Sequence, residues 1–501
     1  MMGSLYTAAT GMNGLSRGLQ TISNNLANTN TVGYKQSSML FEDLMSQTIN
    51  TRSNFNTNIS QRGAGVRVSA TRTNWEVGGF ETGSTVTDMA INGKGFFGVM
   101  KDGEVLYTRA GNFRFDNQGN LMDPTGYQLL ARPIVNGVTQ SGVEGVKLDT
   151  LGDSGIATHP SRATSYLKMA SNIGGTANNS EDSANPFFSM IQNWNGQVNP
   201  PLGSGDAGYS ESVRVYDQNG DAHNLTVRYD YVGTENGSKV YEFTVGMDPT
   251  EDGSARAGTA GAGLLMSGTV TFDNTGKISG MTAFTPTGND PSDLSAWTQA
   301  QLVDGIPSFT ANFAGSGAQQ ISLDFGLKLN NGWNSAITSP QAGASNPSAF
   351  YETMTGTERD KTSSTANGTK QYSRQQSQDG YPEGSIADLN INSEGVITAR
   401  YTNGQTQDLY QIVLYRFTSE EGLRREGGNH FSATPESGPA DEGLPTEENF
   451  GGVVSTFIEQ SNVDMAREFT QMIITQRGFQ MNSKMVTTSD AMLQKALELK
   501  R

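Results

Sequence analysis

Both ends of the chain carry apolar residues at helical spacing, and this pattern constrains the fold more than any other feature. Near the N-terminus the steps alternate between three and four residues, through Leu5, Ala8, Met12, Leu15, Leu19, Ile22 and Leu26. Near the C-terminus a seven-residue repeat is formed by Ile458, Met465, Met472, Phe479, Val486 and Leu493, with Phe469 and Leu497 in the same stripe. Such stripes are typical of helices that pack against other helices.

Neither expected helix has the charge pattern of a simple coiled-coil pair. Residues 1–35 carry two bases and no acid, and residues 453–501 carry six bases and five acids. Charges at the e and g positions normally specify the partner of a coiled-coil helix, and the N-terminal helix has almost none. We therefore expect this helix to contact like copies. An ordinary intramolecular coiled coil is the alternative. We expect the second helix to run from about Val463 to near the C-terminus, capped by Ser461 or Asn462.

The middle of the chain has the pattern of short strands and tight turns. It holds the acidic excess of a chain whose net charge is −16, and Gly makes up 60 of the 501 residues. Gly and Asn suit hairpin turns. The stretches 93–130 and 387–417 each predict a meander of three or four strands in one domain. Another strand pair is predicted at 212–232, with its turn at Asn219-Gly220.

The predicted fold class is α+β and multidomain, with a terminal α-helical coiled coil and β-rich (all-β) central domains. The outer domains are expected to be inserted into the inner one, with polar linkers at 171–186 and 355–378. The expected domains are 1–35 with 455–501 as terminal helices, 36–75 with 436–454 as connecting segments, 76–149 with 369–435 as a β-rich inner domain, and 150–368 as a β-rich outer insertion of one or two domains.

Composition excludes several classes of function. The chain has no Cys, which excludes disulfides, zinc–thiolate sites and thiol nucleophiles. Its acidic balance argues against nucleic-acid binding. No apolar run approaches the ~18 residues that a membrane span needs. The first residues lack a basic cluster followed by an apolar core, so we expect no Sec-type signal peptide.

We expect no enzyme activity, no cofactor and no metal site. His159, His223 and His430 lie far apart, and His223, beside a hairpin turn, is expected to face solvent. Residues 248–253 begin like a calcium loop, but the glutamate needed at its twelfth position is missing. The glycines of 93–98 lack the Lys-Ser/Thr of a phosphate loop and are interpreted as a turn before a strand.

The segment "NNLANTNTVGYK" (24–35) resembles the signature of bacterial flagellar axial proteins, the rod and hook family. The matching residues are Asn25, Ala27, Asn28, Thr31, Gly33, Tyr34 and Lys35. Residues 458–494 are similar to the C-terminal half of that family through Ser461, Asn462, Val463, Asp464, Met472, Ile473, Gln476, Arg477 and Gln480. The stretches 90–97 and 107–121 resemble the strand domain that follows the first helix.

The large insertion and the return segment at 410–431 resemble the hook members of this family. The resemblance implies a structural subunit that polymerises into a flexible curved tube, a universal joint that transmits motor torque from rod to filament. A distal rod or other axial protein is the alternative within the family. A secreted adhesin with coiled-coil ends is the alternative from another class.

The resemblance also implies partners and a location. The subunit would pass through the flagellar type III export apparatus without a cleaved signal peptide and lie in the hook, outside the cell. Its partners would be copies of itself, the distal rod protein, the hook–filament junction protein and the hook cap protein, with no nucleic acid and no membrane insertion. The terminal helices would be disordered in the monomer and would line the channel of the assembled tube.

The expected assembly residues are the large apolar residues of the two stripes: Leu5, Met12, Leu15, Leu19, Ile22, Leu26, Ile458, Met465, Phe469, Met472, Phe479, Val486 and Leu493. We further hypothesise that Asn28 and Asn30 end the first helix and hydrogen-bond neighbouring backbone, and that Gly33 supplies a turn. A simple C-cap is the alternative. Trp75 is expected to pack at the entrance to the strand domain.

Overall fold

The chain divides by its internal contacts into two compact units, each described by itself. The computed structural model describes residues 2–45, 47–50, 59–135, 137–148, 158–175, 186–203 and 205–498. The first unit comprises Met1–Thr158 and Ser385–Arg501, and the second comprises His159–Gly384. The expected boundary at 149–150 lies outside the described residues, and the expected domain ranges stay predictions.

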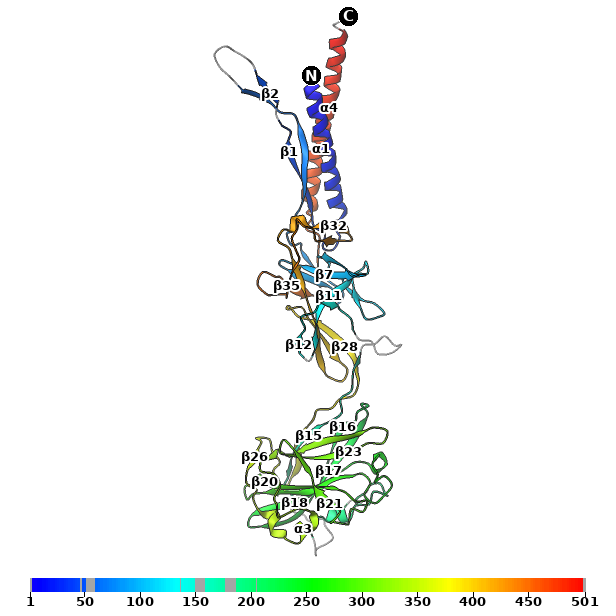
Figure 1. Ribbon diagram of the computed structural model, residues 1–501, viewed down its shortest axis with the longest axis vertical. Helices are drawn as coiled ribbons and strands as arrows, with labels where there is room; N and C mark the ends of the chain where they lie inside the picture. Colours follow the sequence, from blue (N-terminus) through cyan, green and yellow to red (C-terminus); the bar gives the residue numbers. More distant parts are fainter. Residues whose placement is uncertain are drawn as a thin grey trace. The chain divides into compact units, whose positions relative to one another are not determined.

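Two long helices begin and end the first unit, where the apolar spacing predicts them. α1 spans Met2–Ala27 and α4 spans Met465–Glu498. Figure 1 shows the two helices side by side, with both chain termini at the same end of the pair. The helices are antiparallel, as the neighbouring residues across the pair show: Gly11 with Asn482, Leu15 with Gly478, Gly18 with Thr475, and Asn25 with Glu468.

Glycine residues on α1 allow close packing of its neighbours. A Cβ atom at Gly11 would lie 3.0 Å from Nδ2 of Asn482, and a Cβ atom at Gly14 would lie 3.1 Å from the ring of Phe41. Phe41 belongs to β1 (Ser37–Asp43), which pairs antiparallel with β4 (Val66–Thr73) and lies along α1. A second short pair, β2 (Gln47–Asn50) with β3 (Ile59–Arg62), follows β1 in the chain.

The rest of the first unit is a β-domain built from two distant parts of the chain. Its earlier strands are β5 (Phe80–Thr82), β6 (Met89–Asn92), β7 (Phe96–Lys101), β8 (Glu104–Thr108), β9 (Arg114–Phe115), β10 (Leu121–Met122), β11 (Gln128–Val135), β12 (Val138–Thr139) and β13 (Glu144–Gly145). Its later strands are β28 (Gly384–Ile391), β29 (Val396–Tyr401), β30 (Thr406–Ile412), β31 (Leu414–Arg416), β32 (Arg424–Gly427), β33 (His430–Ser432), β34 (Asp441–Gly443), β35 (Gly452–Ser455) and β36 (Phe457–Glu459).

Strands from the two parts combine in one sheet. The order β28-β29-β30-β11-β7-β8-β33-β32 places early strands between late ones. The predicted meanders at 93–130 and 387–417 therefore share one domain. Their apolar side chains meet in one buried cluster, which includes Phe97, Leu129 and Ile397.

The described part of the second unit contains two large sheets and the two-stranded pair β25–β26. One has the order β22-β23-β24-β15-β27 and the other runs in sequence from β16 to β21. The strands are β15 (Tyr166–Ile173), β16 (Tyr209–Tyr216), β17 (Ala222–Glu235), β18 (Ser238–Gly246), β19 (Leu264–Phe272), β20 (Ile278–Pro286), β21 (Trp297–Gln299), β22 (Gln301–Val303), β23 (Ile306–Asn312), β24 (Ala318–Asp324), β25 (Leu327–Leu329), β26 (Thr357–Arg359) and β27 (Gln371–Gln378). The short helices are α2 (Ser189–Gln192) and α3 (Pro340–Ala344), and β14 (Thr158–His159) lies at the division in the sequence.

The hairpin predicted at 212–232 is confirmed, because β16 and β17 pair on either side of Asn219-Gly220. The interpretation of the polar runs as linkers is wrong for the described parts. Residues 171–173 lie in β15 and residues 371–378 form β27, and these two strands pair with each other. Residues 176–185 of the first run lie outside the described residues.

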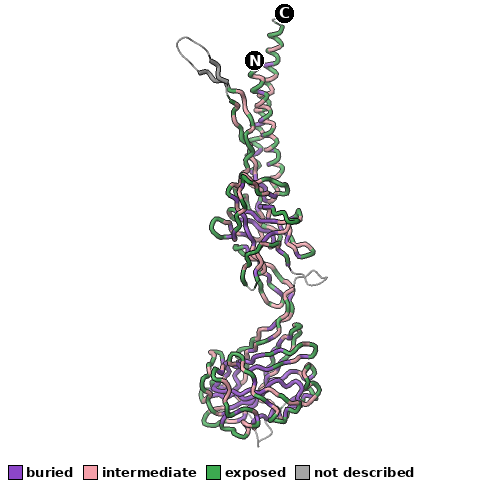
Figure 2. Tube along the Cα trace, in the orientation of Figure 1, coloured by how far each residue is buried: buried purple, intermediate pink, exposed green. Residues whose placement is uncertain are grey.

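Buried residues concentrate in the β-domain of the first unit and in the second unit, whereas the helices are half-buried or exposed along most of their length (Figure 2). The expectation of a β-rich chain with terminal helices is confirmed. None of the described helices is long and apolar enough to cross a membrane.

Candidate functional site

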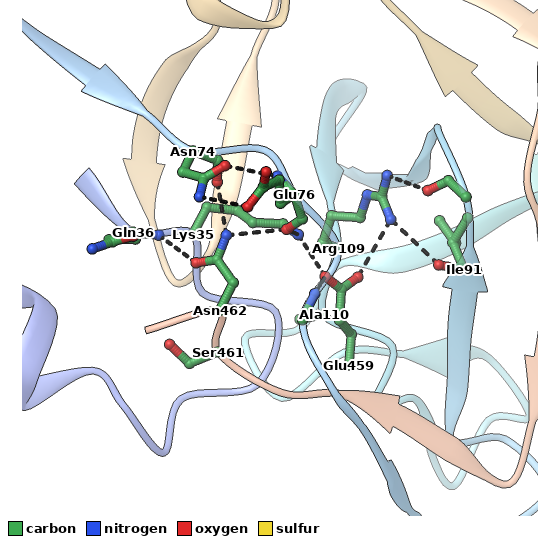
Figure 3. A network of polar contacts seen from close by, with 12 residues as sticks. Lys35, Gln36, Asn74, Glu76, Ile91, Arg109, Ala110, Glu459, Ser461 and Asn462 are labelled. Atoms are coloured by element: carbon green, nitrogen blue, oxygen red, sulfur yellow. Dashed lines mark hydrogen bonds and ion pairs between the residues drawn. The ribbon is translucent and has the colours of Figure 1, made fainter. Parts of the chain in front are cut away.

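The family-motif residues that follow α1 meet the residues that precede α4 at one place, shown in Figure 3. We define this junction as residues 33–37, 74–78 and 459–462 together with Arg109. Backbone hydrogen bonds hold its three segments. Gly33 N–H donates to the carbonyl of Glu459 (2.7 Å), Asn462 N–H donates to that of Tyr34 (3.4 Å), and Asn74 N–H donates to that of Gln36 (2.8 Å).

A buried ion cluster lies at the centre of the junction. The Nζ atom of Lys35 is 2.5 Å from Oε1 of Glu459 and donates a second hydrogen bond to the carbonyl of Glu76 (2.7 Å). Nη1 of Arg109 is 3.3 Å from Oε2 of the same glutamate. Gly78 N–H also donates to Oε1 (3.0 Å). Both oxygens of the carboxylate therefore have partners, from three separate parts of the chain.

The cluster is electrostatically costly and depends on Glu459. The side chains of Lys35 and Glu459 are fully buried, and that of Arg109 is 4% exposed. Burial lowers the pKa of Lys35 and that of Arg109, while the carboxylate of Glu459 opposes both shifts. Transfer of such an ion from water into the protein interior costs several kcal/mol. A well-placed partner of opposite charge and further hydrogen bonds return about the same amount. Without the carboxylate, two cations would be left buried.

Asn462 joins two segments of the junction through its carboxamide. Its Oδ1 accepts from the backbone N–H of Gln36 (2.7 Å). Its Nδ2 donates to the carbonyls of Asn74 (2.9 Å) and Glu76 (3.0 Å). This position needs a side chain with both an acceptor and a donor, which explains why the motif has an amide here.

Asn25 does the same at the end of α1. Its Oδ1 accepts from the N–H of Ser37 (3.0 Å) and from the hydroxyl of Tyr34 (3.2 Å). Its Nδ2 donates to the carbonyl of Ser37 (2.7 Å) and faces Oε2 of Glu468 on α4 (3.4 Å). The side chain is therefore a bridge between the end of α1, the start of β1 and the first turn of α4.

The asparagines that follow Asn25 have different environments. Nδ2 of Asn28 donates to the carbonyl of Asn24 (2.8 Å), and the hydroxyl of Thr31 donates to Oδ1 of Asn28 (3.1 Å). Asn28 thus bonds backbone at the end of the helix, as hypothesised, and this is also what a C-cap does. Asn30 is exposed.

Gly33 provides the turn and the space that the junction needs. Its φ is +69°, and an added Cβ atom would lie 2.6 Å from the backbone nitrogen of Ala110 and 2.8 Å from the carbonyl carbon of Arg109. A side chain at this position is excluded both by the left-handed backbone and by the neighbouring strand end.

The helix α4 begins at Met465, two residues later than the expected start at about Val463. Oδ1 of Asp464 accepts from the N–H groups of Ala466 (2.9 Å) and Arg467 (3.2 Å), so Asp464 is the N-cap. The prediction of Ser461 or Asn462 as the cap is wrong. Asn462 is used by the junction instead. Other motif residues have no such role: Val463 is buried, and Ala27, Gln476 and Arg477 are exposed.

The structure brings together part of the predicted apolar stripes. Ile22 is buried, and most of the others are half-buried: Leu5, Met12, Leu15, Leu19, Leu26, Met472, Val486 and Leu493. Met465, Phe469 and Phe479 are exposed. The placement of Ile458 in an inner helix is wrong. It lies in β36 opposite Glu81 of β5, because the helix starts only after the Asp464 cap.

The face of α4 that packs against α1 is more polar than the sequence analysis assumed. The buried residues of α4 are Glu468, Thr475 and Ser489, spaced by multiples of seven. The large apolar residues flank this face and are exposed, among them Ile473, Ile474, Met481, Met485 and Met492. Several large exposed apolar side chains on one helix are typical of a surface that contacts another molecule.

Two further expectations about individual side chains are decided by the structure. Trp75 packs edge-on against Phe96 and Phe431, with ring centroids 5.3 and 4.9 Å apart, at the start of the β-domain as expected. His223 does not face solvent. It stacks on Phe313 (3.9 Å) and lies between the carboxylates of Asp217 and Glu251. Among the described residues, no three His, Asp or Glu side chains are placed to hold a metal ion.

The sequence analysis missed Arg109 and Glu459. No apolar period or turn motif marks a buried charge, and the two residues are 350 positions apart. Glu468 was also missed, since a carboxylate in a helix is normally assigned to the solvent face.

Four family models match this chain, in order along it. They are "Flagella basal body rod protein" at residues 5–35, "Flagellar hook protein FlgE/F/G D1 domain" at 90–156, "Flagellar basal body protein FlaE D2 domain" at 193–381 and "Flagellar basal body rod FlgEFG protein C-terminal" at 454–499.

Relatives match from end to end. The flagellar hook protein FlgE of Treponema pallidum is 29% identical and that of Borreliella burgdorferi 28% identical, with the whole of each chain covered. That of Salmonella typhimurium is 26% identical over 99% of this chain and 100% of its own. A crystal structure of Helicobacter pylori flagellar hook protein FlgE2 covers 76% of this chain and 100% of its own, with 15% identity and a TM-score of 0.43, which is too distant to support an argument. The chain is a member of the flagellar hook protein family.

Proposed function

We propose that this chain is the structural subunit of the bacterial flagellar hook, and that its copies polymerise into a flexible curved tube. The tube acts as a universal joint that transmits motor torque from the rod to the filament. As a member of the hook protein family, the chain is a structural protein of the flagellum and not an enzyme. The alternatives, a distal rod or other axial protein and a secreted adhesin, are not favoured, because the relatives are hook proteins over their full length.

The observation that carries this proposal is the exposed apolar surface on both flanks of α4. At 100° per residue, Ile474 and Met481 lie on one flank of the face that contacts α1, and Phe469 and Ile473 lie on a second, outer flank, about 120° and 160° around the helix from Thr475. Water contact with these side chains is unfavourable in a monomer, and neighbours on two sides would remove it. In the proposed tube, α1 and α4 form an inner coiled coil that lines the channel and becomes ordered on assembly.

The junction suits a subunit that transmits force. The ion cluster of Lys35, Arg109 and Glu459 connects the inner helices to the β-domain within one subunit. Buried, mutually hydrogen-bonded groups have few alternative arrangements. A force applied to the helices would therefore be transmitted to the β-domain while the arrangement of the ion cluster stays the same.

The inserted second unit would supply the compliance of the hook. Its residues lie between the two sequence segments of the first unit, and its surface is rich in Ser, Thr, Asn and Gln. Weak polar contacts between such surfaces would let neighbours slide as the tube rotates. The further partners that we propose are the distal rod protein, the hook cap protein, the hook–filament junction protein and the type III export apparatus, which would release the subunit outside the cell without signal cleavage.

The test is polymerisation of the purified full-length chain with ammonium sulfate, viewed by negative-stain electron microscopy. We expect curved tubes. Ile473→Glu places a charge on a flank of α4 and is expected to abolish them. Val303→Glu makes the same change at an exposed position of β22, and tubes are expected to persist. Monomers or short dimers from the unmodified chain would contradict the proposal, as would full assembly of Ile473→Glu.

A further inference from the structure

We propose that Met481, Met485 and Met492 form an oxidation site on α4, here named the methionine stripe, and that conversion of its thioethers to sulfoxides by hydroperoxides blocks assembly of the subunit. The inference rests on the proposed function, because the stripe is part of the same surface of α4. It adds a covalent modification, its chemical agent and its consequence.

The three side chains are accessible and aligned. Met481 is 70% exposed, Met485 53% and Met492 51%. They are spaced by four and seven residues, so they lie in one line along the helix, and Ile474 extends that line by a further seven. At 100° per residue, this line is about 100° around the helix from the buried Thr475 and about 40–80° from the buried Ser489. The stripe therefore lies on a flank of α4 and does not face α1.

Methionine is the oxidisable sulfur of this protein, and six of its methionines are protected by burial. The chain has 19 Met and no Cys. Six methionines are buried in the cores, with exposures of 4% or less: Met89, Met169, Met190, Met247, Met266 and Met281. A peroxide in solution reaches exposed thioethers first. The structure thus separates fast sites on α4 from slow sites in the β-domains of the same molecule.

The chemistry needs only the hydroperoxide as co-reactant. A lone pair of the methionine sulfur attacks one oxygen of hydrogen peroxide, an S–O bond forms and the O–O bond breaks. The sulfur loses two electrons, and the other oxygen leaves as water after it takes up the proton. The product exchanges a flexible apolar side chain for a polar one with a hydrogen-bond acceptor.

A sulfoxide on this flank opposes assembly for a simple physical reason. The apolar line of Ile474, Met481, Met485 and Met492 favours association because neighbours remove it from water. A sulfoxide oxygen on that line must give up its hydrogen bonds to water when the flank is covered. Conversely, a covered methionine is out of reach of peroxide. Oxidation and assembly therefore exclude each other, and subunits that have not yet assembled are the vulnerable ones.

The experiment treats purified full-length protein with dilute hydrogen peroxide, removes the peroxide with catalase, and measures each methionine by peptide mass spectrometry. We expect sulfoxide at the stripe and at the exposed Met45 and Met465 well before the six buried methionines. Sedimentation after addition of ammonium sulfate then gives the protein concentration at which tubes form. We expect that concentration to rise by about tenfold or more after oxidation.

Variants assign the effect to the stripe. In Met481→Leu/Met485→Leu/Met492→Leu the side chains keep their size and cannot be oxidised, so assembly should resist peroxide. Met45→Leu, a matched change at an exposed site away from α4, should leave assembly sensitive. In a second measurement, peroxide is added to preformed tubes, and the stripe should oxidise at least about tenfold more slowly than in subunits, as expected for covered side chains.

The outcomes separate this inference from the proposed function. Tubes at an unchanged concentration from protein fully oxidised at the stripe would overturn the inference alone, as would equal peroxide sensitivity of the triple leucine variant. Unprotected stripe methionines in preformed tubes would do the same. Untreated protein that forms no tubes would overturn the proposed function and this inference together.

Discussion

The ammonium group of Lys35 and the carboxylate of Glu459 lie 2.5 Å apart and are fully buried, although 424 residues separate them in the sequence. The pair joins the segment after the first helix to the segment before the last one. Arg109 adds a second cation from the β-domain. A contact of buried charged groups therefore links both helices to the β-domain within the first unit.

Substitution of Glu459 by Gln should destabilise the first unit strongly. The variant leaves Lys35 and Arg109 buried beside a neutral amide, and loss of one partner of a buried ion pair costs about 3–5 kcal/mol. The measurement is urea unfolding at neutral pH, followed by the fluorescence of Trp75, which belongs to the junction and packs against Phe96.

The control for this prediction is Glu421→Gln. Glu421 pairs with Arg72 at 2.7 Å, but both side chains are more than half exposed. Surface pairs contribute less than about 1 kcal/mol. Equal losses from the two substitutions would show that burial of the junction has no energetic role.

Gly33→Ala should disrupt the turn that leads into the junction. The new Cβ atom would meet backbone atoms of Arg109 and Ala110 at less than 3 Å, and the backbone is left-handed at this position. Backbone cannot move aside as a flexible side chain does. We expect a loss above the ~1–2 kcal/mol of left-handed strain alone. Gly404→Ala measures that strain by itself, since its φ is +83° with no neighbour within 4 Å. Identical unfolding free energies for the two variants would refute the steric argument.

Asn25→Ala and Asn24→Ala test neighbouring asparagines of very different burial. Asn25 is 1% exposed and makes bonds to Tyr34 and Ser37, so its removal leaves buried groups unpaired at about 1–3 kcal/mol. Asn24 is exposed, and its Nδ2 donates to the Tyr34 hydroxyl. We expect its replacement to change stability by less than about 0.5 kcal/mol. Urea midpoints of the two variants decide between a specific role of Asn25 and a general effect of the motif.

Apolar periodicity predicted the elements that it can describe. The helices at 2–27 and 465–498 follow from large apolar residues at helical spacing, and the hairpin at Asn219-Gly220 follows from turn chemistry. The extension of the repeat to Ile458 was wrong, because a seven-residue period contains no information about where a helix begins. That limit is set by the Asp464 cap.

The packing face of the helices and the junction were beyond such patterns. Gly14 and Gly18 on α1 and Thr475 on α4 are small or polar, so a search for large apolar residues passes over them. The partner of Lys35 is determined by tertiary structure, since any of the many acidic residues is an equal candidate in one sequence. The motif resemblance pointed to Lys35 and Asn462 but supplied no contact for either of them.

The second unit holds a carboxylate in its core that makes stability depend on pH. Glu242 on β18 is fully buried, lies opposite Asp230 on β17, and accepts from the N–H of Met190 (3.2 Å). Burial, with the nearby charge of Asp230, raises the pKa of Glu242 to about 8. The usual value for a glutamate is about 4.3. At neutral pH the folded protein therefore holds a proton that the unfolded chain has released.

The sign of the pH dependence follows from that proton. Stability associated with Glu242 is fully present below about pH 4.3 and is lost as pH rises toward 8, since the folded state binds the extra proton across this range. The full loss is about 5 kcal/mol if the site titrates alone. Glu242→Gln removes the titration, so this variant should become more stable than the unmodified protein above pH 8 and lose that advantage near pH 5.

The measurement is urea unfolding from pH 5 to pH 9, followed by the fluorescence of Trp194 and Trp297 in the adjoining core. Glu358→Gln, at an exposed carboxylate of β26, should leave the pH profile unchanged. A constant difference between Glu242→Gln and the unmodified protein at every pH would contradict the prediction, because it would mean that this carboxyl group titrates alike in the folded and unfolded chains.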